Sequence, residues 1–522
     1  MIKQFQAFLR QEWGSLLVIC IAVVIQLYLV TRSLPFLITN VLPDDAFYYF
    51  DIARSIVLGT GSSFNGIDMT NGYHPLWLVV LLPIFKFFYT TASDITPIRI
   101  ALIVAVVLNA ITAIFVLRIL TRFSNDSYVR ALGMIVWLLN PFLLYESING
   151  LETALTLCLF SVFFLLALRN EEGKSESYWM TGLVGGLMVL ARLDMVFYLG
   201  AYLVWILFRR GWRIGLRPAF ITGCIAAIPL IPWVIWNALN FHMILTGSSN
   251  AEVLVNHELI VQDHGTSVLQ FLKAIVYLTQ YSASALFDRT GMYALSFFGM
   301  GAAAVLIVRH EIKIPKRFSK MKLSQYMCGA FLMLFIADAS IRWTVRPWYF
   351  VSFELLLAIG AVVALSAMKP YVNHYRTGVY ILIGLILCSF FVDWSKNVRG
   401  AYHGQDQMYS TSLWMNEHLP STTKIGIFNA GIEEYFSTRP IVNLDGLVNV
   451  NAYHAMQRRE LWNYIQSQHI GYIADFDEYL TYRYKSFFGI DDPFANMTFT
   501  YTVDGLSTTT RSQNGVNIYK IK

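Results

Sequence analysis

The pattern of apolar and polar positions divides the chain into a long membrane-like part and a shorter tail of different character. Long apolar segments recur through residues 1–394, and nearly all have the length needed to cross roughly 30 Å of hydrocarbon. They lie at about 15–34, 76–90, 97–118, 128–147, 151–168, 178–208, 217–240, 290–308, 323–341, 347–367 and 378–394. The pattern predicts an α-helical polytopic membrane protein with about eleven transmembrane helices.

The tail has shorter apolar runs that alternate with helical patterns. Strand-length runs lie at 424–428, 440–444 and 470–474, and helical patterns at 412–418 and 452–468. Strands that alternate with helices predict a small soluble α/β domain. We therefore expect a transmembrane module at 1–394 and a C-terminal α/β domain at 395–522.

Basic clusters give the orientation of the segments. Arginines gather at 209–217, and arginines and lysines gather at 309–322. Because cytoplasmic loops carry an excess of Lys and Arg, both clusters are expected inside the cell. The loops at 35–75 and 241–289, together with the C-terminal domain, are then outside.

The parity of the crossings leaves two arrangements open. In one, the segment at 76–90 does not cross, and 178–208 is a hairpin broken at residues 191–194. In the other, 76–90 crosses and 178–208 is a single span. Both arrangements place the same loops outside.

Composition supports this class of protein. Hydrophobic residues make up 56% of the chain and charged residues 14%, against about a quarter charged in soluble proteins. The formal net charge of +6 is spread over short loops, as the positive-inside tendency produces. It gives no reason to expect nucleic acid as a partner.

An acidic pair, Asp44-Asp45, lies just beyond the first apolar segment. Charge beside a membrane is costly unless it is solvated or used, so the pair is a candidate functional site. Neighbouring side chains point in different directions, so one carboxylate can act as a general base while the other orients it or binds a metal. The alternative is a helix N-cap before residues 46–58, which accounts for one carboxylate but not for both.

Other polar residues of the first outer loop have two interpretations each. The predicted helix at 46–58 is amphipathic and suits the membrane interface, where Arg54 either reaches a phosphate or extends toward lipid headgroups. Asn71 and His74 come just before a helix that begins at Pro75. His74 is either a donor to a phosphate oxygen or a satisfied interfacial histidine.

Further charges lie near the membrane in the middle of the chain. Glu152 falls in the first turn of a predicted helix, where capping is its simplest role. Arg192 and Asp194 lie between apolar runs, so they pair with one another or line a polar cavity. Arg342 and Arg346 lie at the outer end of 323–341, against the positive-inside tendency, and guanidinium groups there suit a phosphate.

Seven short motifs in order carry a resemblance to a known superfamily. They are Asp44–Tyr49 with Asp51–Arg54, Thr70–Trp77, Asn140–Phe142, Gly150–Leu155, Ala191–Asp194, Pro347–Phe350, and Tyr435–Pro440 with Asn443–Asn449. In these motifs the chain resembles bacterial integral-membrane glycosyltransferases of the GT-C superfamily, and among them the arabinofuranosyltransferase-like and related branch. Several relatives carry a Lys before the proline of the second segment, whereas this chain has His74.

The resemblance implies a function and a site. The function is inverting transfer of a pentose such as arabinofuranose, or of a hexose, from a polyprenyl-phosphate donor to a glycan, lipid or protein acceptor. It implies the outer face of a bacterial inner membrane as the place of reaction. We expect Asp44 or Asp45 to be the base, with Asp44 preferred. The other expected residues are Arg54, His74, Arg192, Arg342 and Arg346 for the donor phosphate or substrate, and Tyr48, Asn71, Glu152 and Asp194 as supporting or acceptor-contacting residues.

Two questions accompany this interpretation. A polyprenyl phosphate leaves without help from a metal, so no cofactor is required, but a divalent cation at Asp44 and Asp45 stays open. A transporter or flippase of lipid-linked sugars is the alternative function, and the intramembrane Arg192 and Asp194 would serve it equally well.

Overall fold

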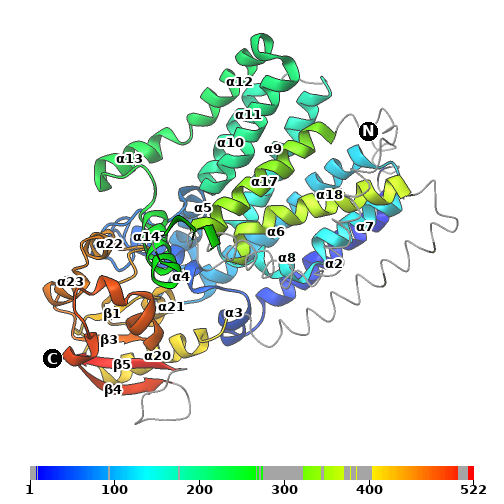
Figure 1. Ribbon diagram of the computed structural model, residues 1–522. Coiled ribbons are helices and arrows are strands. Elements are labelled where there is room, and N and C mark those ends of the chain that lie inside the picture. Colours follow the sequence, from blue (N-terminus) through cyan, green and yellow to red (C-terminus); the bar gives the residue numbers. More distant parts are fainter. Residues whose placement is uncertain are drawn as a thin grey trace.

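The computed structural model describes residues 8, 10–91, 94–173, 177–265, 267–269, 272–273, 321–341, 346–368, 377, 384, 402–503 and 515–522. Figure 1 shows a bundle of helices with a sheet-containing C-terminal part packed against one end of it. The predicted segment at 290–308, nearly all of that at 378–394, and Arg342 lie outside the described residues.

The bundle is built from apolar helices. Among the described helices, α2, α6 and α9 are long and apolar enough to cross a membrane, and α12 with α13 forms a fourth such unit, bent by 49°. A polytopic helical membrane fold is thus confirmed, while the number eleven stays a prediction. The helices are α2 (Trp13–Val30), α3 (Leu34–Asn40), α4 (Asp44–Val57), α5 (Pro75–Phe88), α6 (Thr96–Phe123), α7 (Ser127–Leu138), α8 (Pro141–Glu146), α9 (Thr153–Glu171), α10 (Tyr178–Ala191), η1 (Leu193–Met195), α11 (Val196–Arg210), α12 (Trp212–Ala227), α13 (Ile231–Phe241), α14 (Gly247–His264), α17 (Met321–Ile341), η3 (Pro347–Phe350) and α18 (Val351–Met368).

Helix α5 begins and ends on the side of the bundle that carries the C-terminal part. At its start, the backbone amide of His74 donates to the Tyr49 hydroxyl of α4 at 3.0 Å. Soon after its end, the carbonyl of Asp94 accepts a hydrogen bond from Tyr435, in the C-terminal part, at 2.7 Å. With 14 residues, the helix is shorter than the roughly 20 residues that a crossing needs. Its length and these two contacts support the arrangement in which 76–90 does not cross.

Helices α10 and α11 form a hairpin whose turn lies at Arg192. The Asn170 amide, near the end of α9, donates to Thr181 of α10 and to Tyr202 of α11, each at 2.9 Å. At the opposite end of α9, Glu152 accepts a hydrogen bond from Arg192. Both helices therefore run alongside α9, and the structure supports the arrangement in which 178–208 is broken and 76–90 does not cross.

The C-terminal domain, by which we mean residues 402–522, contains a five-stranded sheet of order β2-β1-β3-β5-β4. Strands β1, β2 and β3 are parallel, and β5 runs antiparallel to both β3 and β4. The strands are β1 (Ile425–Ile427), β2 (Ile441–Asn443), β3 (Tyr472–Asp475), β4 (Met497–Val503) and β5 (Val516–Ile521), and the helices are α20 (Gln405–His418), α21 (Gly431–Phe436), α22 (Val450–Gln457), α23 (Leu461–Ser467), η4 (Tyr479–Arg483), η5 (Lys485–Phe487) and η6 (Pro493–Asn496).

The expected α/β character of this part is confirmed, with two differences. The predicted helix at 452–468 is two helices, because Arg459 takes a left-handed conformation with φ 54° between α22 and α23. The antiparallel pair β4 and β5 was not predicted.

Helix α4 joins the two parts of the molecule. Residues 46–55 of α4 are all buried, and the helix lies between α5 and α21 (Figure 1). Phe50 stacks on Phe85 of α5 at 6.0 Å, and Phe47 meets Tyr435 of α21 edge-on at 5.7 Å. Apolar side chains of α5 and α21 therefore cover this helix on both sides, and its expected place along the membrane interface stays a prediction.

Close packing of α4 on α21 depends on Gly431. A Cβ atom there would lie 2.5 Å from the backbone oxygen of Asp44. We expect Gly431→Ala to lower the free energy of unfolding by about 1–3 kcal/mol, because the helices must move apart. Thermal unfolding of the purified protein in detergent measures the effect. Gly360→Ala, whose new methyl group would have no atom within 4 Å, is the control, and equal midpoints for the two variants would contradict this packing.

Candidate functional site

The carboxylate of Asp44 accepts hydrogen bonds from backbone amides of the C-terminal domain. Its Oδ1 accepts the backbone amide of Ile432 at 2.7 Å and its Oδ2 that of Gly431 at 3.2 Å. Burial raises the pKa of Asp44 to about 7, although the two amide hydrogen bonds oppose the rise. Pro43 is the N-cap of α4, so Asp44 does not cap its own helix. It caps α21, 388 residues further along the chain.

The carboxylate of Asp45, unlike that of Asp44, is available to a bound substrate. It forms no hydrogen bond or ion pair with any other residue that the structure describes, and it faces a cavity of about 120 Å³. Burial raises the pKa of Asp45, and the positive charge of Arg346 opposes the rise. The cavity is lined by residues of α4, η1, α14, η3 and the loops between helices, including Tyr48, Tyr49, Tyr73, His74, Glu152, Arg192, Asp194, Ser248, Ser249, Glu252, Trp348 and Tyr349.

Arg192 lies in the wall of this cavity with its guanidinium group engaged by the protein. Its Nε donates to both Asp194 oxygens at 2.9 and 2.8 Å. Its Nη1 donates to Glu152 at 3.3 Å and to the carbonyl of Trp348 at 3.2 Å. The structure thus has the expected pairing of Arg192 with Asp194, and the pair links the α10–α11 turn to α9 and η3.

Glu152 connects three elements around the cavity. Its Oε2 accepts the Tyr49 hydroxyl of α4 at 2.9 Å, and its Oε1 lies 4.0 Å from Nε2 of His74, before α5. Its side chain makes no capping hydrogen bond with α9. Glu152 is the N-cap residue of α9, at the helix start as expected, but its carboxylate faces the cavity instead of capping the helix.

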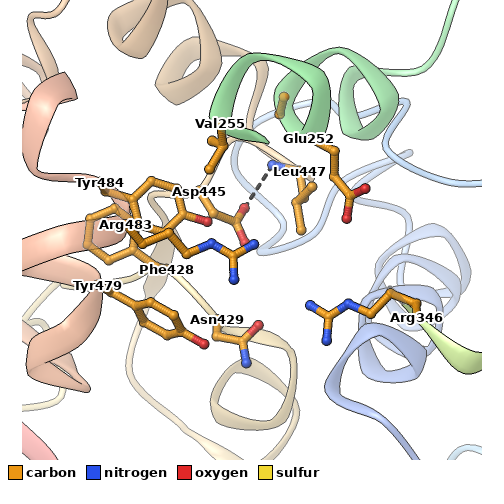
Figure 2. A pocket seen from close by; sticks show the side chains of 11 residues that line it. Glu252, Val255, Arg346, Phe428, Asn429, Asp445, Leu447, Tyr479, Arg483 and Tyr484 are labelled. Atoms are coloured by element: carbon orange, nitrogen blue, oxygen red, sulfur yellow. Dashed lines mark hydrogen bonds between the residues drawn. The ribbon is translucent and has the colours of Figure 1, made fainter. Parts of the chain in front are cut away.

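Two arginines point into a second cavity that adjoins the first at Glu252 and Leu447. Figure 2 shows Arg346, which precedes η3, and Arg483, at the end of η4, with their guanidinium groups turned toward the space beside Glu252 and Asn429. The Nε atoms of both are buried and have no hydrogen-bond partner among the described residues. Buried cations without a matching partner are unfavourable, so the geometry suits an anion.

This second cavity is narrow. It measures about 10 Å³, roughly the space of one water-sized group. A single anionic oxygen fits it, while the larger adjoining cavity has room for a bulkier group.

Arg54 lies outside both cavities. It forms ion pairs with Asp51 at 3.0 Å and with Glu434 at 3.1 Å, and it donates to the carbonyl of Tyr435 at 3.1 Å. Neither expected role, phosphate contact or extension toward lipid headgroups, agrees with this position. Arg54 instead attaches α4 to α21.

Two other expected residues support the loops around the site. The Asn71 amide donates to Asn237 at 3.0 Å and its oxygen accepts the backbone amide of Gly247 at 3.0 Å, so it holds the start of α14. Tyr48 lines the larger cavity, and its hydroxyl accepts the amide of Ala430 at 3.2 Å.

A metal site at the acidic pair finds little support in this geometry. Both oxygens of Asp44 face backbone N–H groups, and no cluster of three or more His, Cys, Asp or Glu side chains within the described ranges could hold a metal. The sequence interpretation also missed Glu252 and Arg483. Neither carries a local signal, because each reaches the site only through tertiary packing.

Comparisons with known proteins give the fold. A family model described as a domain of unknown function (DUF8728) matches residues 396–519, and curated protein sequences give no match. A crystal structure of the Archaeoglobus fulgidus oligosaccharyltransferase tethered with an acceptor peptide is similar over 97% of this chain and 74% of that one, with 15% identity and a TM-score of 0.60. ArnT from Cupriavidus metallidurans bound to undecaprenyl phosphate is similar over 97% of both chains, with 12% identity and a TM-score of 0.58. Its apo form has 14% identity and a TM-score of 0.53. The fold is therefore shared with the oligosaccharyltransferase and with ArnT, whereas membership of the GT-C superfamily and of its arabinofuranosyltransferase-like branch stays a prediction.

Proposed function

We propose that this protein is an inverting membrane glycosyltransferase that moves a sugar from a polyprenyl-phosphate donor to an acceptor. The reaction takes place on the outer face of a bacterial inner membrane, on the side of the C-terminal domain. One observation carries the proposal. The carboxylate of Asp45 faces a cavity that adjoins a cleft lined by Arg346 and Arg483, whose Nε atoms have no hydrogen-bond partner among the described residues. A base beside a cation site is what sugar transfer from a phosphate requires.

The fold likeness supports the donor class. One similar structure is of ArnT bound to undecaprenyl phosphate, and another is of an oligosaccharyltransferase with a tethered acceptor peptide. Fold alone does not determine chemistry, so the argument depends on the site. A sugar, as a pentose or a hexose, fits the larger cavity, which is lined by tyrosines and carboxylates. The acceptor is a glycan, a lipid or a protein.

Asp45 is the general base in this proposal. Its carboxylate accepts the proton of the acceptor hydroxyl while the acceptor oxygen attacks the anomeric carbon. The bond from the anomeric carbon to the phosphate oxygen breaks, and its electron pair leaves with the lipid phosphate. Asp44 is less suited to this role than we expected from the sequence, because both of its oxygens already accept backbone amides.

Arg346 stabilises the leaving phosphate. Its guanidinium group lies close enough to Asp45 to alter the pKa of that carboxyl, and it forms no ion pair with any carboxylate that the structure describes. A preorganised cation where negative charge develops lowers the barrier. Arg192, by contrast, is occupied by Asp194 and Glu152, and we assign it to the wall of the cavity.

The proposal is tested with purified protein in detergent. A panel of undecaprenyl-phosphate donors carrying arabinofuranose, mannose, glucose or an amino sugar is incubated with membrane extract as acceptor source. We expect release of undecaprenyl phosphate with one donor class. If every donor stays intact but is moved across liposomes that contain the protein, the alternative of a flippase holds instead.

The pH dependence tests the interaction of Asp45 with Arg346. Asp45 must be ionised to act, so kcat/KM should rise as the pH rises through its pKa, which burial raises above the usual 3.8. Arg346→Gln removes the charge that lowers this pKa, and we expect the acidic limb of the pH profile to move to higher pH. Arg346→Lys keeps the charge and serves as control. A uniform loss of rate in Arg346→Gln, without a shifted limb, would contradict the interaction.

A further inference from the structure

Of the two arginines that line the narrow second cavity, which we call the cleft, Arg483 comes from the C-terminal domain. It ends η4, just after the sheet strand β3, while Arg346 comes from the membrane part, before η3. Figure 2 shows the two guanidinium groups on facing sides of the cleft. The cleft therefore lies between the two parts of the molecule.

Aromatic rings fix the position of Arg483. Its guanidinium carbon lies 5.7 Å from the ring centres of both Tyr479 and Tyr484. The Tyr484 ring stacks on Phe428 at 4.3 Å, within the core of the C-terminal domain. A long side chain held in this way loses little further freedom on binding a ligand.

Two carboxylates, Asp445 and Glu252, line the cleft beside Arg483, and Arg483 forms no ion pair with either of them. Asp445 accepts the backbone amide of Leu447 at 2.8 Å (Figure 2) and lies 3.4 Å from the Tyr48 hydroxyl. Burial raises the pKa of Asp445 well above its usual value, which favours the neutral acid. Arg483 itself has a buried Nε atom without a hydrogen-bond partner in the described parts of the chain.

We propose that Arg483 binds the phosphate of the lipid donor together with Arg346, so that the C-terminal domain supplies half of the donor phosphate site. This inference rests on the proposed function for its donor class. Guanidinium groups bind phosphate oxygens through paired hydrogen bonds. Two of them from facing sides hold a phosphate at the junction of the cavities, with one oxygen in the narrow cleft.

The test measures binding of undecaprenyl phosphate, without sugar, to the full-length protein in detergent. We expect Arg483→Gln to weaken this binding by roughly 10- to 100-fold, and Arg483→Lys to recover part of the loss. In a transfer assay, KM for the donor should rise more than kcat falls. Arg458→Gln is the control, because Arg458 lies in the same domain with a side chain that is 62% exposed.

The outcomes separate the two proposals. Binding of undecaprenyl phosphate that is unchanged in Arg483→Gln overturns the inference even if sugar transfer occurs. A higher KM for the acceptor alone also overturns it, because the anion would then belong to the acceptor. If no sugar is transferred but binding of the lipid phosphate still depends on Arg483, the inference holds and the proposed function fails. Thermal unfolding of the three variants checks that each is folded.

Discussion

Replacing Asp45 with Asn is expected to lower kcat by roughly 100- to 10,000-fold, the usual contribution of a general base. Asn keeps the size of the side chain but cannot accept the acceptor's proton. Because Asp45 makes no hydrogen bond or ion pair with the rest of the described chain, the change should leave the fold intact. The assay is release of undecaprenyl phosphate from the donor, with the thermal midpoint measured in parallel.

Two comparisons make this result specific. Asp491→Asn changes an exposed carboxylate and should keep the activity of the unchanged protein. Asp44→Asn should instead lower the unfolding midpoint, because an amide group cannot accept both the Gly431 and Ile432 amides. Full activity in Asp45→Asn together with complete loss in a folded Asp44→Asn would reverse our assignment and favour Asp44 as the base.

The second large effect is expected at Arg192, and it is an effect on stability. Its side chain and that of Glu152 are 3% and 4% exposed. Arg192→Met leaves the buried carboxylate of Glu152 and the partly buried carboxylate of Asp194 without their cation, which costs about 3–5 kcal/mol. We expect a lower unfolding midpoint in detergent, and we expect the double variant Arg192→Met/Asp194→Asn to recover part of the loss, since it removes one unpaired charge.

The same experiment tests the role first expected for Arg192. A phosphate-binding arginine would raise KM for the donor while leaving the unfolding midpoint in place. Arg458→Met breaks an exposed ion pair with Glu460 and is the control, because surface ion pairs contribute little. If the unfolding midpoint of Arg192→Met equals that of Arg458→Met, the result favours the role first expected for Arg192, which is binding of the donor phosphate.

Local features of this fold could be predicted from the sequence. Apolar segment lengths identify the membrane helices, and alternating runs identify β1, β2 and β3. The break between α10 and α11 was located correctly at residues 191–194 as one of two arrangements. The run Met497–Val503, in which threonines alternate with larger apolar residues, carries a strand signal that we overlooked.

Which residues form the site depends on tertiary contacts, and these could not be predicted from sequence patterns. Asp44 and Asp45 are adjacent and chemically identical, and only the packing of α21 against α4 makes one of them structural. Arg54 lies on an amphipathic helix, as an interfacial residue would, yet it forms an ion pair with Glu434, 380 residues away. Arg483 lies in the C-terminal domain, and its approach to Arg346 follows from the packing of that domain against the helix bundle.

Asp44 and its hydrogen-bond partner Ile432 are far apart along the chain, so they are synthesised at different times. The carboxylate leaves the ribosome 388 residues before its partner amide. At about 5–20 residues per second, that interval lasts roughly 20 to 80 seconds, and Arg483 emerges later still. Throughout this period the nascent chain has its base but not its full phosphate site. Under the proposed function, an unfinished or truncated chain therefore binds lipid-linked sugars more weakly than the complete protein does.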